Sequence, residues 1–193
     1  MDCGVSLDWR SLKVNRRGCG EPVAAASPDE ARRTRYGRLQ KFSAWIHHEE
    51  RTLEQLRAIG ADVPEMLDRV GPVILMEYLG DQDNPAPVLL VVELGFAEAE
   101  AIYKRILWNV DLFLKTHRVH ADLSAYNVLY WEARAIIIDF LLSVDPCYNE
   151  DAFDLLVRDL ENLNAYFVQY DIELVDPIVH ALSLWRTHVD PLH

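Results

Sequence analysis

The chain has 193 residues, half of them apolar, and its 31 acidic and 19 basic side chains leave a formal charge of −12. A sequence of this length and apolar content can bury a core without disulfides or a structural metal, which excludes a disordered chain. A negative surface repels phosphates, so broad binding to nucleic acid is not expected. Because we find no N-terminal leader and no apolar run of about 18 residues, we expect a cytoplasmic protein with no membrane partner.

The first segment, residues 1–36, has the glycine and proline content of a linker, and only residues 5–14 are strand-like. We therefore expect a poorly determined N-terminal remnant or linker there. Gly18 and Gly20 do not predict a phosphate-binding loop, because no strand precedes them and no third glycine follows.

A helix and a strand are predicted next. The helical pattern runs from about residue 42 to 59, with Gly60 as its C-terminal stop. Residues 72–80 form a short apolar run closed by a glycine, which predicts a buried strand. The polar, proline-containing stretch 81–87 is typical of a connector, so we place a boundary between two halves of the protein there.

The second half is predicted to be mostly helical. Residues 97–118 carry apolar side chains on one stripe of an amphipathic helix. Two β-rich runs, 127–130 and 135–138, follow and predict a hairpin. A second amphipathic helix is expected after the hairpin, and a last helix from Pro177 to His188. The core-packing stripe of the second helix consists of Leu156, Leu160, Leu163 and Phe167.

The residues most indicative of chemistry lie between His120 and Phe140. This stretch places a carboxylate at Asp122, an amide at Asn127 and a second carboxylate at Asp139, after a short apolar strand. Phosphoryl transfer on Mg²⁺ needs a carboxylate that orients the nucleophile, and hard oxygen ligands for the metal. An aspartate after a strand is usually a turn residue. The complete pattern, His-x-Asp-x-x-x-x-Asn followed by Ile-Asp-Phe, is typical of the catalytic loop and metal-binding aspartate of kinases.

These residues resemble the RIO-type atypical serine/threonine protein kinases. The resemblance rests on His-Ala-Asp-Leu-Ser-Ala-Tyr-Asn-Val-Leu-Tyr at 120–130, on Ile-Ile-Asp-Phe at 137–140, and on Met-Glu-Tyr-Leu-Gly at 76–80 with Pro-Ala-Pro at 85–87. It covers roughly residues 37–170. The serine in the Asp-Leu-Ser core distinguishes this family from ordinary protein kinases, which place a lysine there.

The resemblance implies an α+β, protein-kinase-like fold of two lobes, with a reduced N-terminal lobe and a mostly helical C-terminal lobe. After the remnant at 1–36, residues 37–80 would form a partial N-terminal lobe with the hinge and the helix that carries a glutamate. Residues 81–193 would form the C-terminal lobe with the catalytic loop.

The resemblance also implies roles at the phosphate end of the site. Asp122 would be the catalytic aspartate, which orients the attacking group or, in this family, is transiently phosphorylated. Asn127 and Asp139 would hold Mg²⁺ against the β- and γ-phosphates of ATP.

Further residues are implied around the nucleotide. The adenine edge would meet the Glu77 carbonyl and the Leu79 amide, with Met76 behind the ring. Glu49 looks like the helix glutamate that pairs with the ATP-orienting lysine. Of the four lysines, Lys13 has the strand-like context that this role needs, and we assign it there.

Two departures from the family pattern stand out. The family places a glycine-containing, phosphate-covering loop and more strands before the lysine, and twelve residues cannot supply them. Leu142 stands where the family usually has a glutamine. These departures are typical of an N-terminally truncated or degenerate member.

Three functions therefore stay open. The first is a RIO-like protein kinase or ATPase that uses Mg·ATP, and the second is a catalytically impaired pseudokinase or scaffold of the same fold. The third is a small-molecule kinase of the aminoglycoside-phosphotransferase type, which the residues around Asn127 disfavour. The sequence does not identify the protein substrate, and a link to ribosome maturation is implied by the resemblance alone.

Overall fold

The computed structural model describes residues 35–71 and 73–190, with side chains described from residue 46 onward. Most of the predicted N-terminal remnant, Lys13 included, lies outside the described part of the chain. The elements in chain order are α1 (Arg35–Ala58), β1 (Met66–Val70), β2 (Val73–Met76), η2 (Leu89–Val91), α2 (Phe96–Lys115), β3 (Val128–Trp131), β4 (Arg134–Ile137), α3 (Ala152–Phe167), η3 (Val168–Tyr170) and α4 (Pro177–His188).

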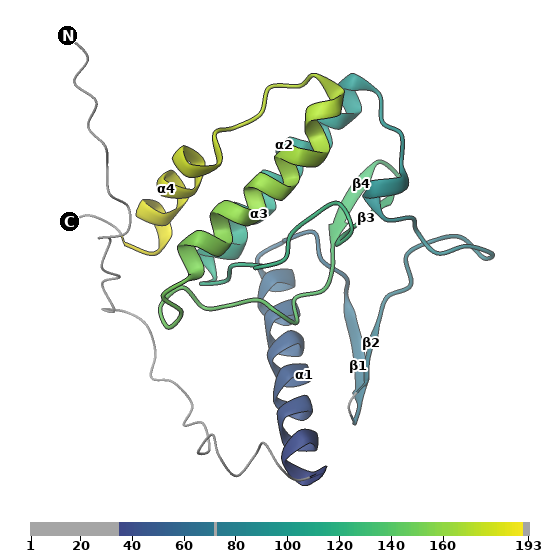
Figure 1. Ribbon diagram of the computed structural model, residues 1–193. Helices are drawn as coiled ribbons and strands as arrows, with labels where there is room; N and C mark the ends of the chain where they lie inside the picture. Colours follow the sequence, from purple (N-terminus) through teal and green to yellow (C-terminus); the bar gives the residue numbers. More distant parts are fainter. Residues whose placement is uncertain (1–34, 72, 191–193) are drawn as a thin grey trace.

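Helix α1 and the hairpin β1–β2 form the N-terminal half, and the hairpin projects beside the helix (Figure 1). α1 begins at Arg35, earlier than the predicted start near residue 42. It ends just before Gly60, which takes a left-handed φ of 85° and confirms the predicted stop. Strand β1 was not predicted from the sequence, and it pairs antiparallel with β2.

The prediction of a buried strand at residues 72–80 was wrong in its burial. β2 forms as a strand, but Val73 is 62% exposed and Leu75 is 55% exposed. The reason is that β1 and β2 make a sheet of two strands with α1 beside it, so one face of the sheet has no covering layer among the described residues. An apolar run therefore does not by itself show that a strand is buried.

The connector at residues 81–87 forms a tight turn, as predicted. Gly80 and Pro85 form an isolated antiparallel bridge, and Asp81 accepts hydrogen bonds from the amides of Asp83 and Asn84 at 2.8 and 2.7 Å. Gly80 has a φ of 144°, and a Cβ there would lie 2.4 Å from the Asn84 carbonyl oxygen. Only glycine fits this close approach of two backbones. The domain boundary itself stays a prediction.

The C-terminal half is built on three helices, α2, α3 and α4, which pack against one another (Figure 1). The predicted stripes of α2 and α3 are confirmed, because their apolar side chains form one buried cluster. Tyr103 on α2 donates to Asn164 on α3 at 2.6 Å and accepts from the Val175 amide at 3.1 Å, which ties the approach to α4 to both helices. No helix in the described ranges is long and apolar enough to cross a bilayer.

The hairpin β3–β4 confirms the predicted strand pair. Val128 pairs with Ile137 at its open end, and its two-residue turn consists of Glu132 and Ala133 with φ of 49° and 57°. Two positive φ values in succession match the right-handed twist of the flanking strands. The Ile137 amide donates to the Asp62 carbonyl at 2.8 Å, so the hairpin is also anchored to the loop after α1.

Candidate active site

The loop before β3 brings two of the predicted site residues together. The Asn127 side-chain amide donates to the Asp122 carbonyl at 2.8 Å and to a carboxylate oxygen of Asp122 at 3.3 Å. The Asn127 backbone amide donates to the Ser124 carbonyl at 3.0 Å, which closes the loop as a turn. Asp122 is exposed, so its carboxylate stays accessible to a ligand.

Asp139 joins this pair from the end of β4. The Ile138 amide donates to the Asn127 carbonyl at 3.0 Å, which holds the exit of the hairpin against the start of β3. Asp139 is exposed and has a left-handed φ of 65°. Aspartate and asparagine tolerate this conformation better than other residues with a Cβ. The structure thus brings the three predicted residues of the phosphate end into one site.

His120 links the loop that carries Asp122 to the segment that follows β4. It is 2% exposed, its Nε2 lies 3.0 Å from the Ile138 carbonyl, and its ring packs on Phe140 at 4.7 Å between centroids. A carbonyl only accepts, so Nε2 carries the proton in this contact. Burial lowers the pKa of His120, which keeps the ring neutral. His120 therefore supports the loop and does not carry charge in the site.

Asp159 on α3 is a site residue that the sequence analysis missed. It is 1% exposed, and its two carboxylate oxygens accept from the amides of Ala121 and Leu123 at 2.8 and 2.9 Å. These two hydrogen bonds, which we call the Asp159 clamp, hold the backbone on both sides of Asp122. Ala121, at one of the two positions, has a left-handed φ of 67°. Arg158 donates to the Ala121 carbonyl. Burial raises the pKa of Asp159 to about 7, against the opposing effect of the two amide donors.

A sequence signal for Asp159 existed. It follows Leu156 by three positions, so it lies on the apolar stripe of α3. A carboxylate on a buried stripe needs donors from another segment. What the sequence alone does not reveal is that these donors are the amides beside Asp122.

Helix α1 reaches the site through two adjacent residues. Glu49 is half-buried, and burial, with a smaller contribution from the charge of Asp139, raises the pKa of its carboxyl. His48 Nε2 lies 2.8 Å from the Ser143 carbonyl and 2.9 Å from its hydroxyl. Within the side chains described, no lysine pairs with Glu49, and its predicted partner Lys13 falls outside them.

The predicted hinge residues follow β2. The Glu77 amide donates to the Glu65 carbonyl at 2.8 Å, and the Glu77 carboxylate accepts from the Glu65 amide at 2.8 Å. The Leu79 carbonyl accepts from the Ala86 amide at 2.8 Å. In the described residues the Glu77 carbonyl and the Leu79 amide have no backbone partner, so both are available to a ligand, and Met76 is exposed beside them.

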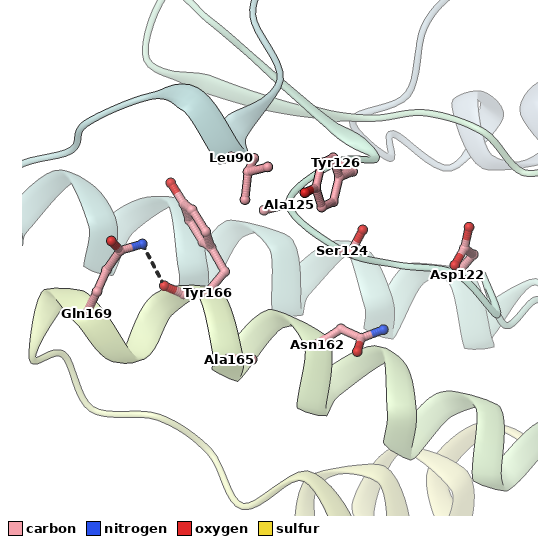
Figure 2. Close-up of a pocket in the computed structure, with 9 residues that line it drawn as sticks. All are labelled: Leu90, Asp122, Ser124, Ala125, Tyr126, Asn162, Ala165, Tyr166 and Gln169. Carbon is pink, nitrogen blue, oxygen red and sulfur yellow. Dashed lines mark hydrogen bonds between the residues drawn. The ribbon is translucent and has the colours of Figure 1, made fainter.

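A cavity of about 570 Å³ opens beside Asp122, between the loop that follows His120 and helix α3 (Figure 2). We call it the loop–α3 groove. The sequence analysis did not anticipate it, because its walls come from three separate segments. Its lining residues are Leu90, Asp122, Ser124, Ala125, Tyr126, Asn162, Ala165, Tyr166 and Gln169.

The fold is protein-kinase-like and α+β, as predicted, and similarity to two solved structures shows it. A solved structure of the Rio2 kinase from Chaetomium thermophilum matches with a TM-score of 0.62 at 16% identity, covering 82% of this chain and 53% of that chain. The Rio2 kinase–ADP/Mg²⁺–phosphoaspartate complex from the same organism matches with a TM-score of 0.56, also at 16% identity, over 83% of this chain and 56% of that one.

Residues 21–178 match the RIO domain family, and the chain belongs to this family. Serine/threonine-protein kinase RIO1 of Caenorhabditis elegans is 30% identical over 151 residues, which are 78% of this chain and 29% of that protein. RIO-type serine/threonine-protein kinase Rio1 of Thermoplasma acidophilum is 30% identical over 133 residues, 69% of this chain and 68% of that protein. The chain spans less than a third of the length of the C. elegans relative.

Proposed function

We propose that the protein is a RIO-like serine/threonine protein kinase or ATPase that uses Mg·ATP. The observation that carries this proposal is the pair of hydrogen bonds from Asn127 to Asp122, together with the Ile138–Asn127 backbone bond that brings the neighbouring Asp139 to the same loop. It is supported by the relatives from C. elegans and T. acidophilum, which are both named as serine/threonine-protein kinases. The choice of cofactor is supported by the similar Rio2 kinase complex, which contains ADP and Mg²⁺.

The donor set fits a magnesium ion. The Asn127 amide nitrogen is used by Asp122, which leaves the amide oxygen for a cation. Together with the Asp139 carboxylate, it gives hard oxygen ligands, the type that Mg²⁺ prefers. Mg·ATP, when bound there, would supply the transferable γ-phosphoryl group and neutralise part of its charge.

The chain's own residues would then position the acceptor. The exposed Asp122 carboxylate has one oxygen held by Asn127, so the other can accept the proton of an incoming hydroxyl. Asp159 fixes the loop backbone on either side of Asp122, and this preorganisation keeps the carboxylate in one place. The Glu77 carbonyl and the Leu79 amide would bind the adenine edge.

A second candidate function is nucleotide binding without turnover. Two observations favour it: the exposed face of β1–β2 and a half-buried Glu49 without a lysine partner among the described side chains. A cytoplasmic location and a link to ribosome maturation stay predictions.

The test measures ATP turnover with Mg²⁺ beside nucleotide affinity, for the chain and for Asp122→Ala and Asp139→Ala. Asp154→Asn is the matched control, because this exposed carboxylate on α3 is outside the site. Turnover that both site variants lose and the control retains is the expected result. Mg²⁺-dependent binding without turnover in the unmodified chain would overturn catalysis and support the second function. A lack of any nucleotide binding would overturn both.

A further inference from the structure

The loop–α3 groove is continuous with Asp122 and long enough for a segment of polypeptide. Figure 2 shows Asp122 at one end and Gln169 at the other, with the loop residues along one wall and α3 along the opposite wall. From Asn162 to Gln169 the helix advances about 10 Å. An extended chain covers that distance in about three residues. The groove therefore matches a short peptide that passes the catalytic carboxylate.

The walls of the groove are fixed to one another by hydrogen bonds. Tyr166 on α3 donates to the Leu89 carbonyl at 2.8 Å, and the Leu90 amide donates to the Ala125 carbonyl at 3.1 Å. The Asn162 amide nitrogen donates to the Leu123 carbonyl at 3.3 Å. α3, η2 and the loop are thus joined pairwise. A groove built in this way is preformed, so binding would not have to order it.

The groove offers hydrogen-bond acceptors to a ligand. The amide nitrogens of Asn162 and Gln169 each donate one hydrogen bond, to the Leu123 and Tyr166 carbonyls, and neither amide oxygen has a partner in the described residues. An extended peptide offers backbone N–H donors to such oxygens. The Tyr126 side chain is 64% exposed, and its ring face can receive a cationic side chain.

The charges around the groove favour a basic ligand over an acidic one. Asp122 is the charged residue of the lining. The exposed carboxylate of Glu161 lies on α3, and that of Asp171 directly follows η3. Arg158, the cation on the same helix, is held by the Ala121 carbonyl. The formal charge of the whole chain is −12. An acidic peptide or a nucleic acid would be repelled here.

We propose that the loop–α3 groove binds the acceptor polypeptide and selects a serine or threonine flanked by basic rather than acidic residues, with an apolar side chain against Leu90. This inference rests on the proposed function and names the substrate class of the same site. Small amines with many hydroxyl groups are the main alternative ligand. The groove suits a peptide better, because its lining has a single carboxylate and its other residues are apolar or uncharged.

The first experiment measures binding, so that it does not depend on turnover. Fluorescently labelled nine-residue peptides with one central serine, flanked by arginine and leucine or by glutamate and leucine, are titrated against the full chain. The basic peptide should bind, and Ala165→Trp should weaken it about tenfold by filling the groove. Ala101→Trp is the matched control, since Ala101 is also an exposed helical alanine but lies on α2 and outside the lining.

A second variant tests the charge preference. Gln169→Lys places a cation in the groove, so it should weaken the basic peptide and strengthen the acidic one, an inversion that loss of structure would not produce. Equal affinities for the two peptides, binding of neither, an equal effect of Ala165→Trp and Ala101→Trp, or preferred binding of a polyhydroxylated amine would each overturn the proposal. Asp122-dependent ATP turnover that persists in that case would leave the proposed function intact as an ATPase.

Discussion

The two hairpins of this molecule have the same local structure and opposite surroundings. β1–β2 and β3–β4 are each antiparallel pairs of short strands, yet Val73 and Leu75 of the first are exposed, whereas Val128 and Ile137 of the second are fully buried. The second hairpin packs on α2, while the first has α1 beside it. The predicted phosphate end of the site is therefore supported by the core, whereas the predicted hinge end depends on local contacts.

The anchoring of β3–β4 extends beyond apolar packing. Asp62, whose carbonyl accepts from Ile137, has its own amide bonded to Asn109 at 2.7 Å and its carboxylate bonded to Arg105. By contrast, β1 is joined to α1 by a partly buried ion pair between Arg69 and Glu50 at 3.2 Å. A single ion pair that keeps contact with water contributes little to stability.

The largest expected effect comes from truncating one apolar side chain in each hairpin. Ile137→Ala should lower the free energy of unfolding by about 3 kcal/mol, because it leaves a cavity in the core. Leu75→Ala should lower it by less than about 0.5 kcal/mol, because the side chain is exposed. Urea denaturation followed by circular dichroism measures both. Equal losses of stability in the two variants would show that Leu75 is buried in solution. That result would contradict the difference in burial between the two hairpins.

A smaller effect is expected from removing the Asp159 clamp, which supports the predicted phosphate end of the site. Asp159→Asn should cost about 2 kcal/mol, since an amide cannot accept from both backbone donors at Ala121 and Leu123. Because the pKa of Asp159 is raised in the folded state, to about 7, its contribution to stability falls as pH rises from the unfolded value of 3.8 through 7.

The penalty of Asp159→Asn should therefore be larger at pH 5 than at pH 8. Parallel urea titrations of the chain and the variant at both pH values measure the difference. Asp154→Asn, on the exposed face of the same helix, should have no such pH dependence. A penalty that grows with pH would mean that the folded carboxyl is held ionised instead.

A third effect concerns α1, which lies beside both β1–β2 and the segment after Asp139. The contact between His48 and Ser143 should have a coupling energy of about 1 kcal/mol in a double-mutant cycle with His48→Ala and Ser143→Ala. Burial lowers the pKa of His48, so its protonation opposes folding, and the coupling should weaken as pH falls below the unfolded value of 6.5. If the effects of the two single substitutions simply add, the contact does not couple α1 to the site.

The smallest effect is expected at the ion pair of the first hairpin. Arg69→Ala should change the free energy of unfolding by less than about 1 kcal/mol, and the change should shrink in high salt because the pair is near the surface. Thermal unfolding at low and high ionic strength measures it. A loss as large as that of Ile137→Ala would contradict the contrast between the two hairpins.

The sequence predicted the C-terminal half well because its signals are local. The apolar stripes of α2 and α3, the proline start of α4 and the two β-rich runs each depend on spacing within one segment. The closeness of Asp122 and Asn127 was also predictable, since both lie on one loop. Their grouping with Asp139 follows from a single hairpin.

What the sequence did not predict depends on contacts between segments. β1 contains Asp68 and Arg69 and has no clear alternation, so it becomes a strand through its pairing with β2. The exposure of β2 reflects the missing cover over its sheet among the described residues, which its own apolar residues cannot report. To predict the role of Asp159, one must know which backbone amides lie opposite its carboxylate. The loop–α3 groove could not be predicted because its three walls come from distant parts of the chain.

The left-handed backbone of Asp139 has an evolutionary consequence. Asparagine and glycine are the residues that best share this conformation with aspartate, and each is one nucleotide away from an aspartate codon. A single base change could thus remove the carboxylate while the loop keeps its shape. Under the proposed function, such a change would abolish phosphoryl transfer and leave the folded surface in place, so one codon separates the proposed enzyme from a binding protein.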